Sequence, residues 1–260
     1  MLPRLICRAF ATATTVCAAL ALALLLLLAP TPSAADDLAD FNAAIEQFAA
    51  HNRVAIGYLR TNNTELATVE IDRMKAAWAN VMTRFGTNPP QALRDNPRYK
   101  QTLSGIQKNI GDAIVLLNTG KAGANMFGPP RNDLVRNSLQ SIREQLSVMR
   151  KESRVTVLAD CVLEANGAMA AFFAFQYTVP DFSKPDVTNK ANALATVIKR
   201  CDEVADADTR KNPEFRRLID GTLNSLTFVP KVIETRDREL LERVIGELRA
   251  FDNLLLFRFG

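Results

Sequence analysis

Residues 96–119 have the sequence NPRYKQTLSGIQKNIGDAIVLLNT, and residues 212–235 have the related sequence NPEFRRLIDGTLNSLTFVPKVIET. Each stretch begins with an Asn-Pro pair, in which a capping side chain precedes a proline whose missing N–H costs nothing at the first helical position. Apolar residues then recur at spacings of three and four, which places them on one helix face. Both stretches therefore predict the same kind of amphipathic helix, once in each half of the chain.

The two stretches correspond position by position. The matched pairs are Tyr99/Phe215, Leu103/Ile219, Gly105/Gly221, Ile110/Leu226, Leu117/Ile233 and Thr119/Thr235. The match continues into the next helix, where Leu139 corresponds to Ile245 and Arg143 to Arg249. The alternative is that any two amphipathic helices look alike. Amphipathicity does not require shared Asn-Pro caps or shared glycines inside a helix, so we favour an internal repeat.

Gly105 and Gly221 stand inside predicted helices. A glycine there costs about 1 kcal/mol relative to alanine. Because this cost recurs at the same place in both halves, we expect a neighbouring helix to approach closely at each glycine.

Helical periodicity extends outward from these stretches over most of the chain. Apolar stripes mark residues 38–59, 71–85, 99–117 and 135–149 in the first half, and helices are expected at 155–177, 187–204, from 212 and at 238–257 in the second. Pro230 predicts a kink or break in the helix that begins at 212. The expected fold is all-α, with tandem up-down-up-down four-helix bundles at 36–152 and 153–260. The short polar linker at 151–153 allows a continuous helix between them.

Residues 1–35 have the organisation of a secretory signal peptide. Two arginines precede an apolar core at 18–29 (AALALALLLLLA), and the small residues at 33–35 form the site that a signal peptidase recognises. We expect cleavage before Asp36. An uncleaved anchor is the alternative, because the apolar stretch at 9–29 is just long enough to span a bilayer.

Export bears on charge and partners. The chain has 32 Lys and Arg against 28 Asp and Glu, and cleavage removes Arg4 and Arg8, which leaves a net charge of about +2. The charges are mixed along the chain rather than clustered, so its basic character does not indicate a nucleic-acid partner. We expect a periplasmic or secreted protein without a stable membrane span after cleavage.

Two cysteines, Cys161 and Cys201, remain after cleavage. The turn between the fifth and sixth helices centres near Phe182, about midway between them, so an antiparallel hairpin brings the two cysteines within about one turn of each other. An oxidising compartment permits a disulfide, which we predict here. Two buried free thiols are the alternative.

His51 is the only histidine of the chain. A zinc site with several histidines, an HExxH motif and a bis-histidine site are therefore excluded, and no nucleophile elbow accompanies His51 for a catalytic triad. It lies at the edge of the first apolar stripe, between Phe48 and Ala55, where a half-buried boundary histidine is the simplest interpretation. Its functional alternative is an axial haem or metal ligand. We predict no metal site and no catalytic residues.

The helical hairpins at residues 106–150 and 222–258 each contain an Ala/Leu-rich helix, a loop and a final helix ending in a basic residue. In this pattern each half resembles the cytochrome c′ and cytochrome b562 group, which implies a four-helix bundle. That group attaches covalent haem through Cys-x-x-Cys-His near the end of the last helix. The corresponding residues here, 145–150 (QLSVMR) and 253–258 (NLLLFR), contain neither the thiols nor the histidine. The resemblance therefore implies a fold without covalent haem.

Taken together, these patterns indicate an exported, non-catalytic helical-bundle protein with a binding or structural role and a small ligand or a protein as its partner. The alternative belongs to another class of function. In it, the bundle binds haem or a metal non-covalently for electron transfer, and His51 is the only candidate nitrogen ligand.

Overall fold

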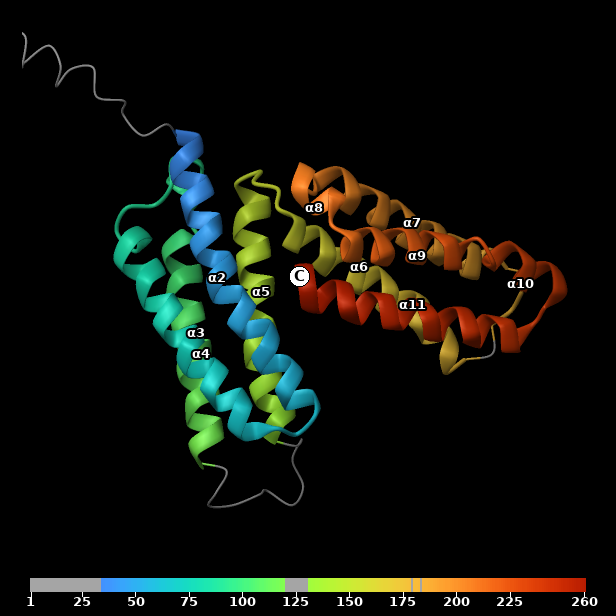
Figure 1. Ribbon diagram of the computed structural model, residues 1–260, viewed down its shortest axis with the longest axis horizontal. Helices are drawn as coiled ribbons and strands as arrows, with labels where there is room; N and C mark the ends of the chain where they lie inside the picture. Colours follow the sequence, from blue (N-terminus) through green and yellow to red (C-terminus); the bar gives the residue numbers. More distant parts are fainter. Residues whose placement is uncertain (1–33, 120–130, 179, 183) are drawn as a thin grey trace, which may run out of the picture.

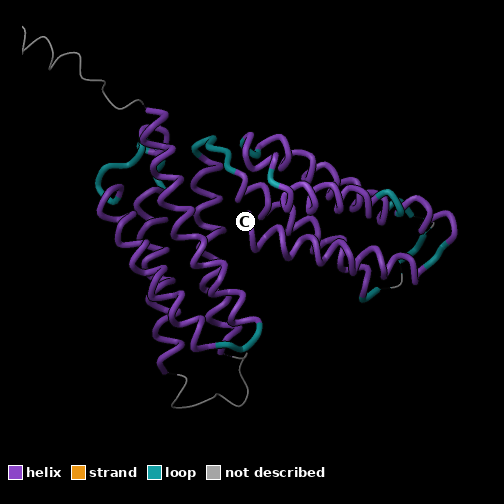
Figure 2. The backbone as a smooth tube through the Cα atoms, in the orientation of Figure 1, coloured by secondary structure: helices purple, strands orange, loops and turns teal. Residues whose placement is uncertain are grey.

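The computed structural model describes residues 34–119, 131–178, 180–182 and 184–260. Over these residues the regular secondary structure consists of helices joined by turns, and it includes no strand (Figure 1, Figure 2). The prediction of an all-α fold is confirmed. Most of the expected signal peptide, residues 1–33, lies outside the described residues.

Four long helices form the N-terminal body, which is upright in Figure 1. They are α2 (Ala34–Arg60), α3 (Thr64–Phe85), α4 (Tyr99–Thr119) and α5 (Arg131–Glu152), with the short η1 (Gln91–Leu93) before α4. Helix α2 packs on α3 and α5, and α4 packs on the same two helices from the other side. Their apolar faces enclose one core, in which the rings of Phe48 and Trp78 lie 5.0 Å apart.

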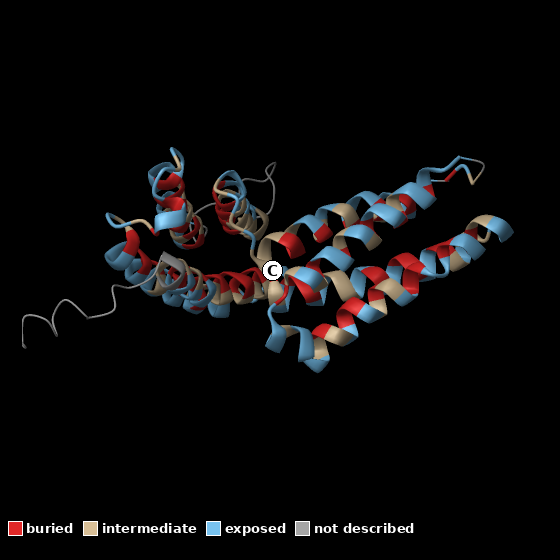
Figure 3. Ribbon diagram, turned by 90° about the horizontal axis from the view of Figure 1, so that it is seen from above, coloured by how far each residue is buried: buried red, intermediate tan, exposed pale blue. Residues whose placement is uncertain are grey.

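The remaining helices form the C-terminal body around a second, separate core. They are α6 (Leu158–Phe173), η2 (Ala174–Gln176), α7 (Asp186–Val204), α8 (Ala207–Lys211), α9 (Pro213–Leu226), α10 (Val229–Thr235) and α11 (Arg238–Phe259). Buried residues line the inner faces of the helices in both bodies, and exposed residues cover the outside (Figure 3). That the two bodies are repeats of one four-helix bundle stays a prediction.

The expected break at Pro230 is confirmed. Helix α9 ends at Leu226, and Pro230 stands in the first turn of α10, where it needs no helical N–H partner. Helix α10 in turn ends at Arg236, which has a φ of 52°. The predicted helix from 212 is therefore two helices.

The linker between the bodies does not continue the helix, although its sequence allows one. Helix α5 ends at Glu152, Arg154 has a φ of 57°, and α6 begins at Leu158. The N–H of Val155 donates to the carbonyl of Arg150 at 2.9 Å, and the N–H of Arg154 donates to that of Lys151 at 3.1 Å. This pair of bonds is a Schellman motif, which ends a helix through one left-handed residue.

Helix α3 is capped by Asn63. The Asn63 side chain, rather than that of Asn62, accepts the N–H of Leu66 at 3.2 Å. Asn62 instead has a φ of 58°, a conformation that asparagine adopts more readily than most residues.

The two Asn-Pro pairs differ in detail. Asn212 caps α9 as predicted, because its side chain accepts the N–H of Glu214 at 2.9 Å. Asn96 accepts the N–H of Arg98 at 2.8 Å, but α4 begins only at Tyr99. The amide of Asn96 also donates to the carbonyl of Met149 at 2.9 Å, which ties the start of α4 to the end of α5.

Both in-helix glycines lie where another helix approaches closely, as the sequence predicts. A Cβ on Gly221 would lie 2.6 Å from the ring carbon Cζ of Phe251 on α11. A Cβ on Gly105 would collide with the side-chain oxygen of Gln145 on α5. Gln145 and Phe251 occupy corresponding positions in the predicted repeat, so each glycine faces the last helix of its own body at the same level.

We expect Gly221→Ala to lower the free energy of unfolding by about 1 to 3 kcal/mol, because the stiff Phe251 ring has to move. Gly246→Ala is the matched control in the same body: no neighbouring atom lies within 4 Å of its added Cβ, so higher helix propensity should stabilise it by up to about 1 kcal/mol. Urea denaturation measures both. Equal gains in stability for the two variants would contradict the close approach at Gly221.

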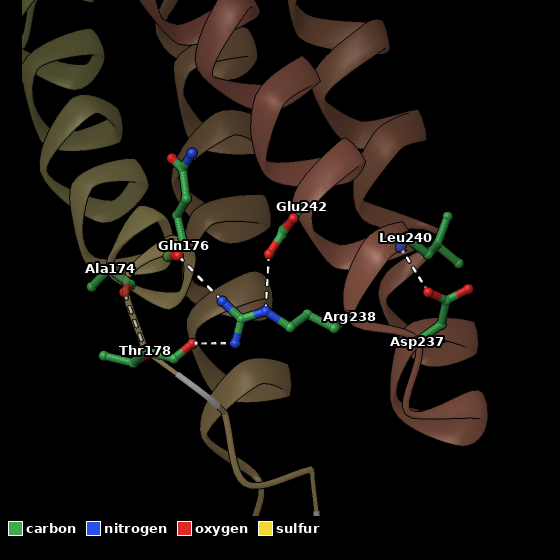
Figure 4. A network of polar contacts seen from close by, with 7 residues as sticks. All are labelled: Ala174, Gln176, Thr178, Asp237, Arg238, Leu240 and Glu242. Atoms are coloured by element: carbon green, nitrogen blue, oxygen red, sulfur yellow. Dashed lines mark hydrogen bonds and ion pairs between the residues drawn. The ribbon is translucent and has the colours of Figure 1, made fainter.

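Arg238 joins the start of α11 to the residues that follow α6 (Figure 4). Its guanidinium donates to the carbonyl oxygens of Thr178 at 3.0 Å and Gln176 at 3.5 Å, just beyond α6, and to Glu242 at 2.9 Å. A cation at unpaired carbonyls near a helix C-terminus is favourable. The contact fixes where α11 begins, so that its other end reaches the N-terminal body.

Cys161 on α6 and Cys201 on α7 lie at disulfide-bonding distance, with Cα atoms 5.4 Å apart. The predicted pairing of these two positions is confirmed. The bridge closes a loop with a sequence separation of 40 residues and joins two helices that pack along each other.

Digestion of the unreduced protein should yield the peptides of Cys161 and Cys201 as one linked species in mass spectrometry, which separates on reduction. Reduction should lower the free energy of unfolding by about 2 to 4 kcal/mol, because the unfolded chain regains loop entropy. If both peptides carried an alkylating label without prior reduction, the bridge would be absent.

Candidate ligand-binding site

A largely buried ion pair joins the two bodies. Arg150, in the last turn of α5, donates from Nε and Nη2 to the two carboxylate oxygens of Asp160 at 2.9 and 2.7 Å. Asp160 stands in the first turn of α6, where a negative charge is favoured. A bidentate pair of this kind fixes orientation as well as distance. The linker and this pair together set where α6 starts relative to α5.

The end of α11 forms a second contact between the bodies. Arg53 on α2 is buried and forms an ion pair with Glu46. Its Nη1 also donates to the carbonyl of Gly260 at 2.8 Å. Nearby, a Cβ on Gly57 would lie 3.4 Å from the ring of Phe257, so α11 rests directly against α2. Figure 1 shows the end of α11 between the two bodies.

A cavity of about 440 Å³, called the junction cavity below, lies where these contacts meet. Its apolar lining includes Ile45, Ala49, Leu146, Val157, Leu158, Leu163 and Phe259. Its polar lining includes Asn42, Glu46, Arg143, Arg150, Asp160, Asp206, Thr209 and Arg258. A mostly apolar cleft with a few converging polar groups at a junction between bodies is the usual form of a small-molecule site.

Arg143 is the unusual member of this lining. Burial, together with the like charges of Arg53 and Arg60, lowers the pKa of its guanidinium to about 10, against a smaller opposing effect of Glu144. Its Nε is buried without a hydrogen-bond partner, and within the described chain no ion pair holds the group. An unsatisfied buried polar group costs about 1 to 3 kcal/mol, and a charged one more.

A second unsatisfied group lies in the same lining. The side-chain oxygen of Asn42 on α2 is buried, and no described residue donates to it. Native proteins leave few such groups, and those that persist often mark a binding site. Both side chains, one from α2 and one from α5, belong to the lining of the junction cavity, although the two unsatisfied atoms themselves are covered.

Positive charge gathers around Arg60, which lines a small pocket together with Arg53 and Arg143. Arg136 and Arg249 add to burial in lowering the pKa of Arg60, whereas Asp252 on α11 raises it. Burial raises the pKa of Asp252 to about 6, against smaller opposing effects of the Asn166 amide, which donates to it at 2.7 Å, and of Arg60. The cluster draws on α2, α5, α6 and α11, which are the helices that form the junction.

Asp252 gives the junction a pH dependence. Because its pKa is raised from 3.8 to about 6, the folded protein holds this proton more tightly than the unfolded chain. Stability from this group is thus present below about pH 4 and is lost as pH rises to about 6. Asp252→Asn stays neutral and keeps an acceptor for Asn166. We expect it to be more stable than wild type by on the order of 1 to 2 kcal/mol at neutral pH.

Denaturation curves of both proteins between about pH 4 and neutral pH measure this effect. The difference in unfolding free energy should shrink towards zero at the acidic end. A difference that stays constant with pH would contradict the raised pKa of Asp252.

His51 lies on a different side of α2 and takes no part in the junction cavity. Its Nδ1 is 2.7 Å from a carboxylate oxygen of Glu70 on α3, and its side chain is 35% exposed, which matches a boundary histidine. Glu70 is buried and also accepts from Arg73 at 2.7 Å. The residues that the structure describes contain no group of three or more His, Cys, Asp or Glu side chains placed to hold a metal ion.

A larger open groove of about 630 Å³ lies between α7, α9 and α10 of the C-terminal body. Its lining is mostly small and apolar, with Ala195, Leu223 and Ile233 among its members. None of its lining side chains has a buried unsatisfied polar atom. The groove has the larger volume, but the junction cavity has the more specific chemistry.

Sequence reasoning did not single out Arg143, Arg150, Asp160 or Asn42. A signal existed for Arg143, which follows Ile142 at the edge of an apolar stripe and corresponds to Arg249 in the predicted repeat. Charged residues at stripe edges are common, however, and periodicity does not tell which of them a second body covers.

Of the described residues, Leu158–Gln176 is long and apolar enough to cross a membrane. In the structure this segment packs against α7 and α11, and its Asp160 and Glu164 form ion pairs. Comparison with known proteins finds no matching family model, curated protein or solved structure.

Proposed function

We propose that this chain is a non-catalytic binding protein that holds a small ligand in the junction cavity between its two helical bodies. The observation that carries the proposal is the unpartnered Arg143 guanidinium in the wall of a cavity of about 440 Å³. Arg143 is partly buried and has no ion pair, and a charge left unpaired in a cleft is a candidate for binding a ligand of opposite charge. The apolar remainder of the lining excludes water around a bound molecule and contributes affinity through burial.

We also propose that the protein is exported and that residues 1–35 are removed as a signal peptide. The pairing of Cys161 with Cys201 supports this, because disulfides persist mainly in oxidising compartments. A periplasmic or secreted location follows. Amino-terminal sequencing of the protein recovered from such a compartment should begin at Asp36, and a chain that begins at Met1 there would contradict the proposal.

Binding of a neutral apolar dye, Nile red, tests whether the cavity takes a ligand. Ala159 lines the junction cavity, so Ala159→Trp should fill it and abolish one equivalent of bound dye. Ala170→Trp, on the exposed side of the same helix, is the matched control and should bind normally. Ala195→Trp fills the open groove instead. Loss of the dye in Ala195→Trp but not in Ala159→Trp would move the site and contradict the proposal.

The second candidate is non-covalent binding of haem or a metal for electron transfer, with His51 as the ligand. The contact of Glu70 with Nδ1 favours it, since a carboxylate on one ring nitrogen orients the other nitrogen in many metal sites. Titration with haemin should then produce a Soret band that His51→Ala lacks. No Soret band in the wild-type protein would leave only the first proposal.

A further inference from the structure

The acidic side chains of the junction cavity are already engaged. Asp160 holds Arg150, and Glu46 pairs with Arg53. Asp206 caps α8 and accepts the backbone N–H of Thr209 at 2.8 Å, which lowers the pKa of its carboxyl. None of these carboxylates is left to hold a ligand cation, and together they would repel an anion with more than one charge.

The basic side chains are engaged with one exception. Arg150 belongs to Asp160, and Arg258 approaches Glu214 at 3.4 Å. Arg143 alone, among the described lining residues, has neither an ion pair nor a partner for its buried Nε. The missing partner of a guanidinium is an anion, and its planar donor fork matches a carboxylate best.

The rest of the lining specifies what the anion carries. Ile45, Leu146, Leu163 and Phe259 face the cavity from α2, α5, α6 and α11. Such a wall favours an apolar body, and a volume of about 440 Å³ falls in the usual range of small-molecule sites. The lining therefore has one place for a negative charge and an apolar chamber beside it.

We propose that the junction cavity binds an organic monocarboxylate with an unbranched or compact apolar body, its carboxylate on Arg143. This inference rests on the proposed function and adds the chemical class of the ligand. Octanoate is a suitable probe, because it combines a single carboxylate with an apolar chain and remains monomeric at millimolar concentration.

Isothermal titration calorimetry of the purified full protein tests the proposal with three probes. Octanoate should bind with one site per chain, and octan-1-ol, which has the same chain without charge, should bind at least about tenfold more weakly. Acetate, which has the charge without the chain, should show no binding. Equal affinity for octanoate and octan-1-ol would overturn the carboxylate assignment. If Nile red still occupied the cavity, the proposed function would survive that result.

Arg143→Met removes the charge and keeps most of the side-chain length. It should weaken octanoate binding at least about tenfold, leave octan-1-ol binding unchanged, and melt no lower than wild type, because a partly buried cation without an ion pair is gone. A merely structural arginine would instead lower the melting temperature. Arg136→Met is the matched control: Arg136 lies on the same helix, pairs with Asp133 at 3.0 Å and stands outside the cavity lining. Its octanoate affinity should equal that of wild type, and an equal loss in both variants would overturn the proposal.

Should Arg143→Met fail to fold, Arg143→Lys provides the second variant. It keeps the positive charge and loses the planar fork, so octanoate affinity should fall while octan-1-ol affinity is retained. Unchanged octanoate affinity in Arg143→Lys would overturn the assignment of the carboxylate to the fork. Binding of neither octanoate nor Nile red by the wild-type protein would overturn both this inference and the proposed function.

Discussion

The buried pair between Arg150 and Asp160 is the interaction on which the arrangement of the two bodies depends. Each body has its own core and closes around its own helices. The linker ends α5 through the left-handed Arg154, and the ion pair then fixes α6 against α5 through two parallel bonds. Removing one partner of such a pair leaves an uncompensated buried charge, which is strongly destabilising. The pair therefore acts more as an orienting device than as a source of net stability.

The proposed ligand site follows from this placement. With α6 held at α5 and the end of α11 held at α2 by Arg53, helices from both bodies surround one cavity that neither body contains alone. The same packing covers Arg143 without supplying an anion, and it covers Asp252 enough to raise its pKa to about 6. Local choices elsewhere in the molecule agree with one another: caps, apolar stripes and glycine contacts all favour the same fold. At the junction, by contrast, Arg143 is left without a partner, and such a local inconsistency is expected at a functional site.

The sequence predicted those features that depend on one helix or on one pair of neighbouring helices. Apolar periodicity located the helices, and Pro230 predicted the break between α9 and α10. The hairpin spacing predicted that Cys161 and Cys201 lie close together. The glycines at corresponding positions, Gly105 and Gly221, indicated where another helix approaches closely. The junction depends on how two finished bodies meet, and a stripe-edge arginine such as Arg143 has the same sequence pattern whether water or a second body covers it. The helix stop at Arg154 was missed for a related reason, because a left-handed residue other than glycine has no strong local signal.

A double-mutant cycle on Arg150 and Asp160 tests most directly whether this pair joins the bodies. Arg150→Met, Asp160→Asn and the double variant, each unfolded in urea, give the coupling free energy of the two side chains. The account predicts that each single variant is destabilised and that the coupling is about 1 to 3 kcal/mol, because the two groups are buried together and bonded twice. Additive effects, with a coupling below about 0.5 kcal/mol, would show that the pair does not hold α6 to α5 and would contradict the account of the junction.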